Sequence, residues 1–205
     1  MEVVMRLLTF FILMLAFTMV VTAQEETLFD LEGENGGFGG PVVKFTSVNG
    51  QAAVMFGGRG GWIIDHSLLL GGGAYSVASE VDAPAGVLPL EGPLDVEFGY
   101  IGFEIEYVVR PMTLWHYSYY LFLGLGATNY VKDVGPVTKS NEQVAETAFM
   151  FTMEPAFNAE LNVSSWARIN AGVSYRIVVG GKQEGLSASD FTGLTATLTF
   201  KFGTF

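Results

Sequence analysis

The sequence contains no cysteine among its 205 residues, which excludes disulfide bonds, thiolate zinc sites and a cysteine nucleophile. The fold must therefore rest on packing and hydrogen bonds. Charge is also scarce, since charged residues make up 15% of the chain and only 10 of them are Lys or Arg, against 21 Asp or Glu. A net charge of −11 argues against a surface that neutralises phosphates, so we expect no nucleic-acid partner.

Hydrophobic residues, glycine and aromatic rings dominate what remains. Half of the chain is hydrophobic, and it includes 26 Gly, 17 Phe and 8 Tyr. Such a chain has too much apolar surface to stay disordered. The abundance of glycine and aromatic residues favours strands over helices.

The N-terminus has the pattern of a secretory signal peptide. A short head with Arg6 precedes an uncharged apolar run over 7–21, and small residues end the segment at Ala23. The run is shorter than the roughly 20 residues of a membrane-spanning helix. We therefore expect residues 1–23 to be a cleaved signal peptide, with an uncleaved anchor as the alternative. Either outcome takes the chain out of the cytoplasm.

After an acidic, glycine-rich lead over 24–40, apolar residues recur at every second position, which is the spacing of strands with two different faces. In 165–178, Ile169 and Val173 share one face, while Arg168 and Arg176 share the other. The regular strands are predicted at 99–107, 148–161, 165–178 and 192–203, and the less regular ones at 41–49, 52–64, 67–78 and 114–130. Eight strands are expected in 41–205.

The connections indicate how these strands are arranged. Tight turns are predicted at 49–50, 65–66, 110–112 and 162–164, and long connections at 79–95, 131–146 and 179–190. Short turns at one end and long loops at the other are typical of an outer-membrane barrel, with an additional tight Asn-Gly hairpin among the outer loops. We therefore predict an all-β fold, an eight-stranded antiparallel up-and-down transmembrane β-barrel with a polar interior.

Volume determines which face of the strands points inward. An eight-stranded barrel has room for few large side chains, so the large apolar residues should contact lipid. The predicted polar network of the lumen consists of Lys44, Arg59, Glu104, Glu106, Glu154, Arg168, Arg176 and Lys201. These opposite charges can pair, which buried charges require. The aromatic residues expected in interfacial girdles are Trp62, Trp115, Tyr117, Tyr130 and Trp166.

The signal peptide, the eight alternating strands and the ending over 199–205, TFKFGTF, resemble the small outer-membrane barrels of the OmpA and OmpX type. The resemblance implies that Phe205 belongs to a C-terminal signal for the barrel-insertion machinery. It also implies periplasmic chaperones as partners and a monomer in outer-membrane lipid and lipopolysaccharide. Phe205 is out of phase with Phe200 and Phe202, so a lipid-facing Phe205 would require a bulge.

One pair of residues suggests catalysis, because His116 and Ser118 share a strand face. The pair resembles the His-x-Ser motif of outer-membrane lipid A deacylases, which would make Ser118 the nucleophile and His116 its base. Tyr119 stands where that family has Asn, and no acid follows at a suitable spacing. We therefore favour a hydrogen-bonded histidine in a polar interior, with no catalytic residues.

The sequence thus predicts a non-catalytic outer-membrane protein for envelope integrity or surface interaction, with no cofactor and no resident metal. A narrow pore or conduit for small solutes or hydrophobic compounds remains an alternative, as does a lipid A hydrolase. The acidic loops could bind divalent cations that bridge lipopolysaccharide phosphates, but we favour plain solvation of these side chains as the explanation.

Overall fold

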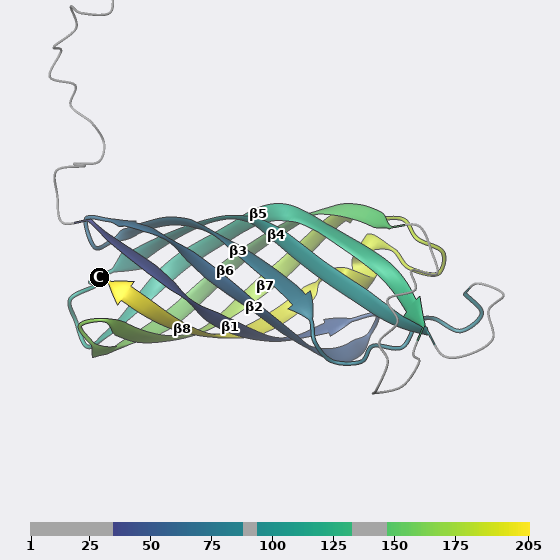
Figure 1. The fold of residues 1–205 in the computed structure, drawn as a ribbon, viewed down its shortest axis with the longest axis horizontal. Helices are drawn as coiled ribbons and strands as arrows, with labels where there is room; N and C mark the ends of the chain where they lie inside the picture. The colour runs from purple at the N-terminus through teal and green to yellow at the C-terminus, as the bar shows by residue number, and fades with distance from the viewer. Residues whose placement is uncertain (1–34, 88–93, 133–146) are drawn as a thin grey trace, which may run out of the picture. The chain divides into compact units, whose positions relative to one another are not determined.

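The computed structural model describes residues 35–87, 94–132 and 147–205, which form a closed barrel of eight strands (Figure 1). The strands are β1 (Gly36–Val48), β2 (Gln51–Ile64), β3 (Leu68–Val77), β4 (Leu94–Val109), β5 (Trp115–Lys132), β6 (Ala148–Ser164), β7 (Ala167–Gly180) and β8 (Gly193–Thr204). A short 3-10 helix, η1 (Ala188–Phe191), precedes β8. All eight predicted strands are present.

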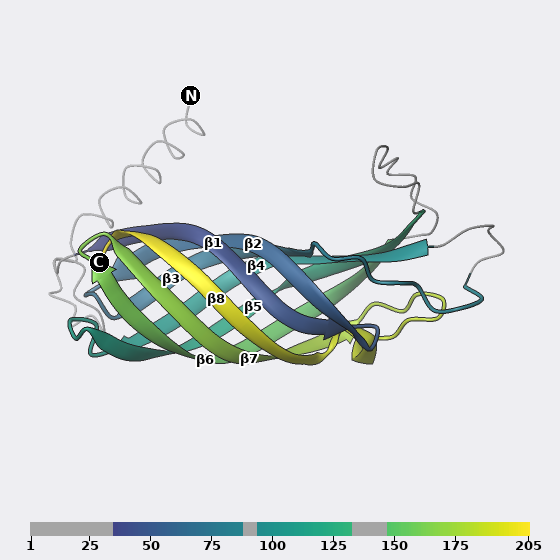
Figure 2. The ribbon, with the colours of Figure 1, turned by 90° about the horizontal axis from the view of Figure 1, so that it is seen from below.

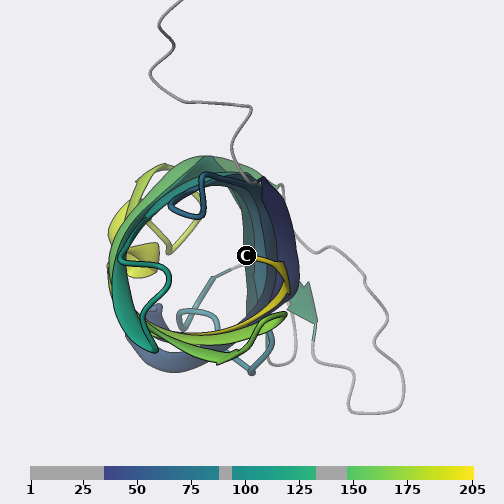
Figure 3. The same cartoon turned by 90° about the vertical axis from the view of Figure 1, so that its left-hand side faces the viewer.

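Each strand pairs antiparallel with its neighbours in the sequence, and β1 pairs with β8 to close the ring (Figures 2 and 3). This order confirms the predicted up-and-down barrel. Every strand has at least 10 residues, which is enough to cross a bilayer when tilted. Among the described residues, no helix is long and apolar enough to cross a membrane.

The two ends of the barrel differ in their connections, as the sequence predicted. Tight turns at 65–67, 110–114 and 165–166 lie at the same end as the C-terminus, which we call the turn end (left in Figure 1). The long connections lie at the opposite end, the loop end, together with the hairpin at 49–50. Strand β1 begins at Gly36, so the wall includes residues of the glycine-rich lead. The predicted signal peptide, 1–23, lies outside the described residues.

Two of the hairpins place both central turn residues at positive φ, which is the backbone conformation that a type I′ turn requires. Asn49 and Gly50 have φ values of 51° and 71°, in agreement with the Asn-Gly signal in the sequence. Asp65 and His66 have φ values of 48° and 54°, although neither is glycine. The second turn is held by a 3.2 Å hydrogen bond from the Ser67 amide to the Ile64 carbonyl.

Replacing Gly50 with alanine is expected to destabilise the barrel by about 1 kcal/mol, since the added Cβ would meet no atom within 4 Å and only the backbone at positive φ would be strained. Urea unfolding of the refolded barrel in detergent measures the effect. An unchanged unfolding midpoint in Gly50→Ala would contradict the prediction.

The outer face of the wall is apolar along the strands, as shown by exposed Phe103, Ile101 and Leu125. Charged side chains that are exposed among the described residues lie at strand ends or in connections, for example Asp65, Arg110 and Glu97. The barrel is therefore inverted relative to a soluble one, with apolar residues outside and charges inside, as expected for a wall in contact with lipid.

Candidate functional site in the barrel lumen

The barrel lumen gathers the charged residues that the sequence placed there. All eight members of the predicted network are buried, and Glu160 on β6 joins them. The contributing strands are β1 (Lys44), β2 (Arg59), β4 (Glu104, Glu106), β6 (Glu154, Glu160), β7 (Arg168, Arg176) and β8 (Lys201). Five cations therefore face four carboxylates inside a closed wall.

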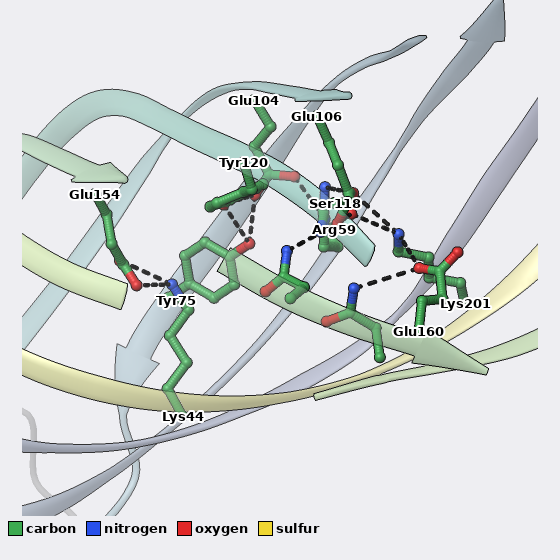
Figure 4. Close-up of polar contacts among 12 residues, drawn as sticks. Lys44, Arg59, Tyr75, Glu104, Glu106, Ser118, Tyr120, Glu154, Glu160 and Lys201 are labelled. Atoms are coloured by element: carbon green, nitrogen blue, oxygen red, sulfur yellow. Dashed lines mark hydrogen bonds and ion pairs between the residues drawn. The ribbon is translucent and has the colours of Figure 1, made fainter. Parts of the chain in front are cut away.

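The half of this network nearer the turn end centres on Lys201, which bridges two carboxylates (Figure 4). Its ammonium group lies 2.9 Å from Glu106 and 2.5 Å from Glu160. Arg59 donates to Glu106 at 2.9 Å and to Glu104 at 2.7 Å. Each carboxylate thus has at least one cation within ion-pair distance, which offsets the cost of removing these charges from water.

A second centre lies towards the loop end, where Lys44 donates to both oxygens of Glu154 at 2.8 and 2.9 Å (Figure 4). Glu154 also accepts hydrogen bonds from Tyr100 at 2.7 Å and from Ser174 at 2.6 Å. A carboxylate can accept about four hydrogen bonds, so these donors nearly saturate it. The pair and its two hydroxyl donors come from four different strands.

Sequence reasoning missed the tyrosines of this network. Tyr75 and Tyr120 both donate to Glu104, the latter at 2.7 Å, and Tyr100 donates to Glu154. The sequence did indicate that these tyrosines face the lumen, because an even number of positions separates them from lumen residues of the same strand. Tyr100 alternates in this way with Glu104 on β4, and Tyr120 with Ser118 on β5. The lumen phase of a strand therefore predicts hydroxyl donors as well as charges.

Arg176 differs from the other four cations because, among the described residues, its contacts include no ion pair with a carboxylate. It donates instead to the carbonyls of Phe191 at 2.6 Å and Ser47 at 3.0 Å, and it lies 3.1 Å from the Met55 sulfur. Its guanidinium also lies over the ring of Phe98, 5.2 Å from the centroid. Arg176 thus ties η1 and the end of β1 to the inner wall.

His116 and Ser118, the two residues of the catalytic alternative, have different hydrogen-bond partners in the structure. Ser118 donates to Glu106 at 2.5 Å and accepts from Asn158 at 3.2 Å, whereas His116 contacts Glu160 at 2.9 Å through Nε2. The His116 Nδ1 atom faces the Thr113 carbonyl, and both side chains are buried. The described contacts contain no hydrogen bond between His116 and Ser118.

The buried charges agree with the predicted polar interior, but apolar clusters occupy the lumen on both sides of them. At the turn end, Phe38, Ile63, Leu69 and Val108 form an apolar cluster, and Phe205 packs against it. Phe205 shares the lumen phase of Lys201, and the Arg168 guanidinium lies 4.1 Å from the centre of its ring. Phe205 therefore faces the lumen without the bulge that a lipid contact would require, and its role as an insertion signal remains a prediction.

A larger apolar cluster fills the loop end. It includes Phe98 and Phe191, whose ring centres are 4.7 Å apart, and Tyr130. Tyr130 was predicted in a girdle, but it is fully buried and donates to the Glu184 carbonyl at 2.5 Å. Inward glycines allow these large side chains to fit, since a Cβ on Gly124 would lie only 2.6 Å from the Phe122 ring. The prediction from barrel volume did not include the space that inward glycines leave for large side chains.

The other four predicted girdle residues are exposed on the outer face, as predicted: Trp62, Trp115, Tyr117 and Trp166.

The filled lumen leaves little free space. A cavity of about 10 Å³, lined by residues including Lys44, Arg59 and Tyr120, has room for about one water molecule. Among the described residues, no group of three His, Asp or Glu side chains is placed to hold a metal ion. Within the described ranges, the lumen is therefore a charge-paired core with little free volume.

Neither family models nor curated proteins match this chain. Among solved structures, the barrel is similar to neisserial surface protein A (NspA), with a TM-score of 0.54 and 12% identity over 83% of this chain and 96% of that one. The attachment invasion locus protein Ail of Yersinia pestis aligns with a TM-score of 0.45 and 14% identity, over 83% of this chain and 98% of that one. OprG of Pseudomonas aeruginosa aligns with a TM-score of 0.46 and 13% identity, over 85% and 99%.

Of these three structures, NspA alone aligns with a TM-score above 0.5. Together with the closed order of strands, this likeness gives the chain the fold of the small eight-stranded outer-membrane β-barrels. It confirms the architectural resemblance drawn from the sequence. At 12% identity, the likeness concerns the fold alone.

Proposed function

We propose that this protein is a non-catalytic, non-conducting barrel of the outer membrane that serves envelope integrity or surface interaction. The observation that carries the proposal is the lumen, in which a charge-paired centre is enclosed by apolar clusters at both ends. A conducting pore needs a continuous aqueous path, whereas these side chains are packed against one another.

The loop end supports a role at the cell surface. Asn49 and Gln51 donate to the Asp82 carbonyl at 2.9 and 2.8 Å, and the Asn49 amide donates to Asp190 at 2.8 Å. These bonds tie the 49–50 hairpin to two of the longer connections. The described part of the loop end is thus linked by hydrogen bonds, which suits contact with lipopolysaccharide or another surface partner.

The apolar wall supports placement in the outer membrane as a monomer. A closed barrel satisfies its backbone hydrogen bonds in lipid without a second copy. Export by a signal peptide, periplasmic chaperones and the barrel-insertion machinery would bring it there. Trp115 and Trp166, exposed near the turn end, would then lie at the periplasmic interface.

Bilayer conductance tests the proposal. Refolded protein that shows a heat-modifiable band on electrophoresis should insert into planar bilayers without producing ion-conducting steps, because the lumen is filled. Steady single-channel steps from the wild-type barrel would overturn the non-conducting assignment. In parallel, a deletion strain should become sensitive to detergent and recover with the wild-type gene, without any change in the acyl chains of lipid A.

A further inference from the structure

The outer wall carries a groove that the lumen and the loops do not explain. It has a volume of about 820 Å³ and lies in the loop-end half of the wall, over strands β2, β1, β8 and β7. Its lining consists of Phe45, Thr46, Ser47, Ala52, Ala53, Val54, Val173, Tyr175, Leu194, Thr195 and Ala196. This volume lies within the range of about 300–1,000 Å³ found for small-molecule sites.

A second hollow extends the groove across β7 to β6. It measures about 230 Å³, reaches Pro155, and shares Val173, Tyr175 and Leu194 with the first. Neither lining contains a charged side chain. The two hollows therefore form one elongated, uncharged depression that suits a long apolar chain.

Irregular strand pairing accompanies the depression. The paired register of β1 and β8 ends at Phe45 and Ala196, although both strands continue towards the loop end. Side-chain bonds bridge the seam there, from Thr46 to the Leu194 carbonyl at 3.2 Å and from Thr195 to Thr46 at 3.0 Å. On the other side, the β6–β7 register skips Pro155, which has no amide hydrogen to donate.

We propose that this depression binds an acyl chain of lipid A, the lipid part of lipopolysaccharide. The inference rests on the proposed outer-membrane location. The depression is continuous with the apolar outer wall, so the bilayer covers it, and its place near the loop end puts it in the outer leaflet. A void beside lipid loses dispersion contacts, and a chain seated between Phe45 and Tyr175 restores them.

The test compares lipid retained by the protein after expression in a Gram-negative outer membrane and purification in mild detergent. Mass spectrometry should find lipid A bound to the wild type. Ala196→Phe fills the depression and should retain roughly tenfold less, because several buried methylene contacts are lost. Ala52→Phe, also in the lining and exposed, provides a second variant in case the first fails to fold.

Ala171→Phe is the matched control, because Ala171 is exposed on β7 but lies outside both linings. It should retain as much lipid A as the wild type. Equal retention by all variants would overturn the proposal, as would bound phospholipid in place of lipid A, or a dimer that Ala196→Phe disrupts. Membrane fractionation and heat-modifiable mobility are read on the same samples, so a protein that is absent from the outer membrane refutes the proposed function instead.

Discussion

Replacing Lys201 with methionine is expected to destabilise the barrel by about 3 kcal/mol or more at neutral pH. Lys201 is fully buried and bridges Glu106 and Glu160, so its loss leaves two neighbouring carboxylates with one cation fewer. Glu106 still pairs with Arg59 and Glu160 with Arg168, which keeps the loss near the lower end of the range for broken buried pairs. Urea unfolding in lipid vesicles, followed by tryptophan fluorescence, measures the effect.

Lys182→Met is the matched control, since Lys182 is exposed in the connection before η1 and should change stability by less than about 0.5 kcal/mol. Acid should reduce the difference between the two variants, because protonation of the carboxylates removes the uncompensated charge that Lys201→Met leaves behind. Adding Glu160→Gln to Lys201→Met should restore part of the stability at neutral pH. Equal unfolding midpoints for the two Lys→Met variants would show that the bridge contributes nothing.

Two neighbouring glycines in β1 are expected to respond oppositely to substitution with alanine. A Cβ at Gly40 would lie 1.7 Å from the Phe200 carbonyl oxygen, so the backbone of β8 would have to move. A Cβ at Gly39 points outward and would lie 3.9 Å from its nearest neighbour, the Arg59 carbonyl oxygen. Gly40→Ala should therefore cost about 1–3 kcal/mol or more, as overpacking does.

Gly39→Ala serves as the control and should be neutral or stabilising by up to about 1 kcal/mol, because alanine loses less backbone entropy than glycine on folding. Unfolding midpoints in urea give both values. The fraction of chains that refold to a heat-modifiable band gives a second reading, since Gly40 lies on the strand pair that closes the ring. Similar effects at the two positions would mean that β1 and β8 are not in close contact at Gly40.

Much of the site was predictable because lumen and lipid impose opposite preferences on alternate residues. The phase of β7, for example, placed Arg168 and Arg176 inside, and the same argument on β4 placed Glu104 and Glu106 there. For Phe205, strand phase predicted the direction of the side chain but not the residues that it contacts. Its phase indicated the lumen, but the apolar cluster that receives it comes from residues on four other strands.

The larger apolar cluster was missed for a different reason. Glycines at inward positions were counted only as small residues, whereas they leave room for the rings of large neighbours, as Gly73 does for Tyr75. Tyr130 follows the inward phase of β5, yet the connection that covers it, and accepts its hydrogen bond, lies beyond the reach of strand periodicity. Volume arguments need the three-dimensional neighbours of each glycine.

The number of strands, the inward and outward face of each, and the two unlike ends could all be predicted from the sequence. These properties follow from local alternation and from turn chemistry, which neighbouring residues specify. The pairing of the charges, in contrast, depends on the tertiary structure. Lys44 and Glu154 are separated by 110 residues, and Lys201 and Glu106 by 95. Such pairs depend on strand register and on closure of the ring, because these place side chains from distant strands at the same height in the lumen.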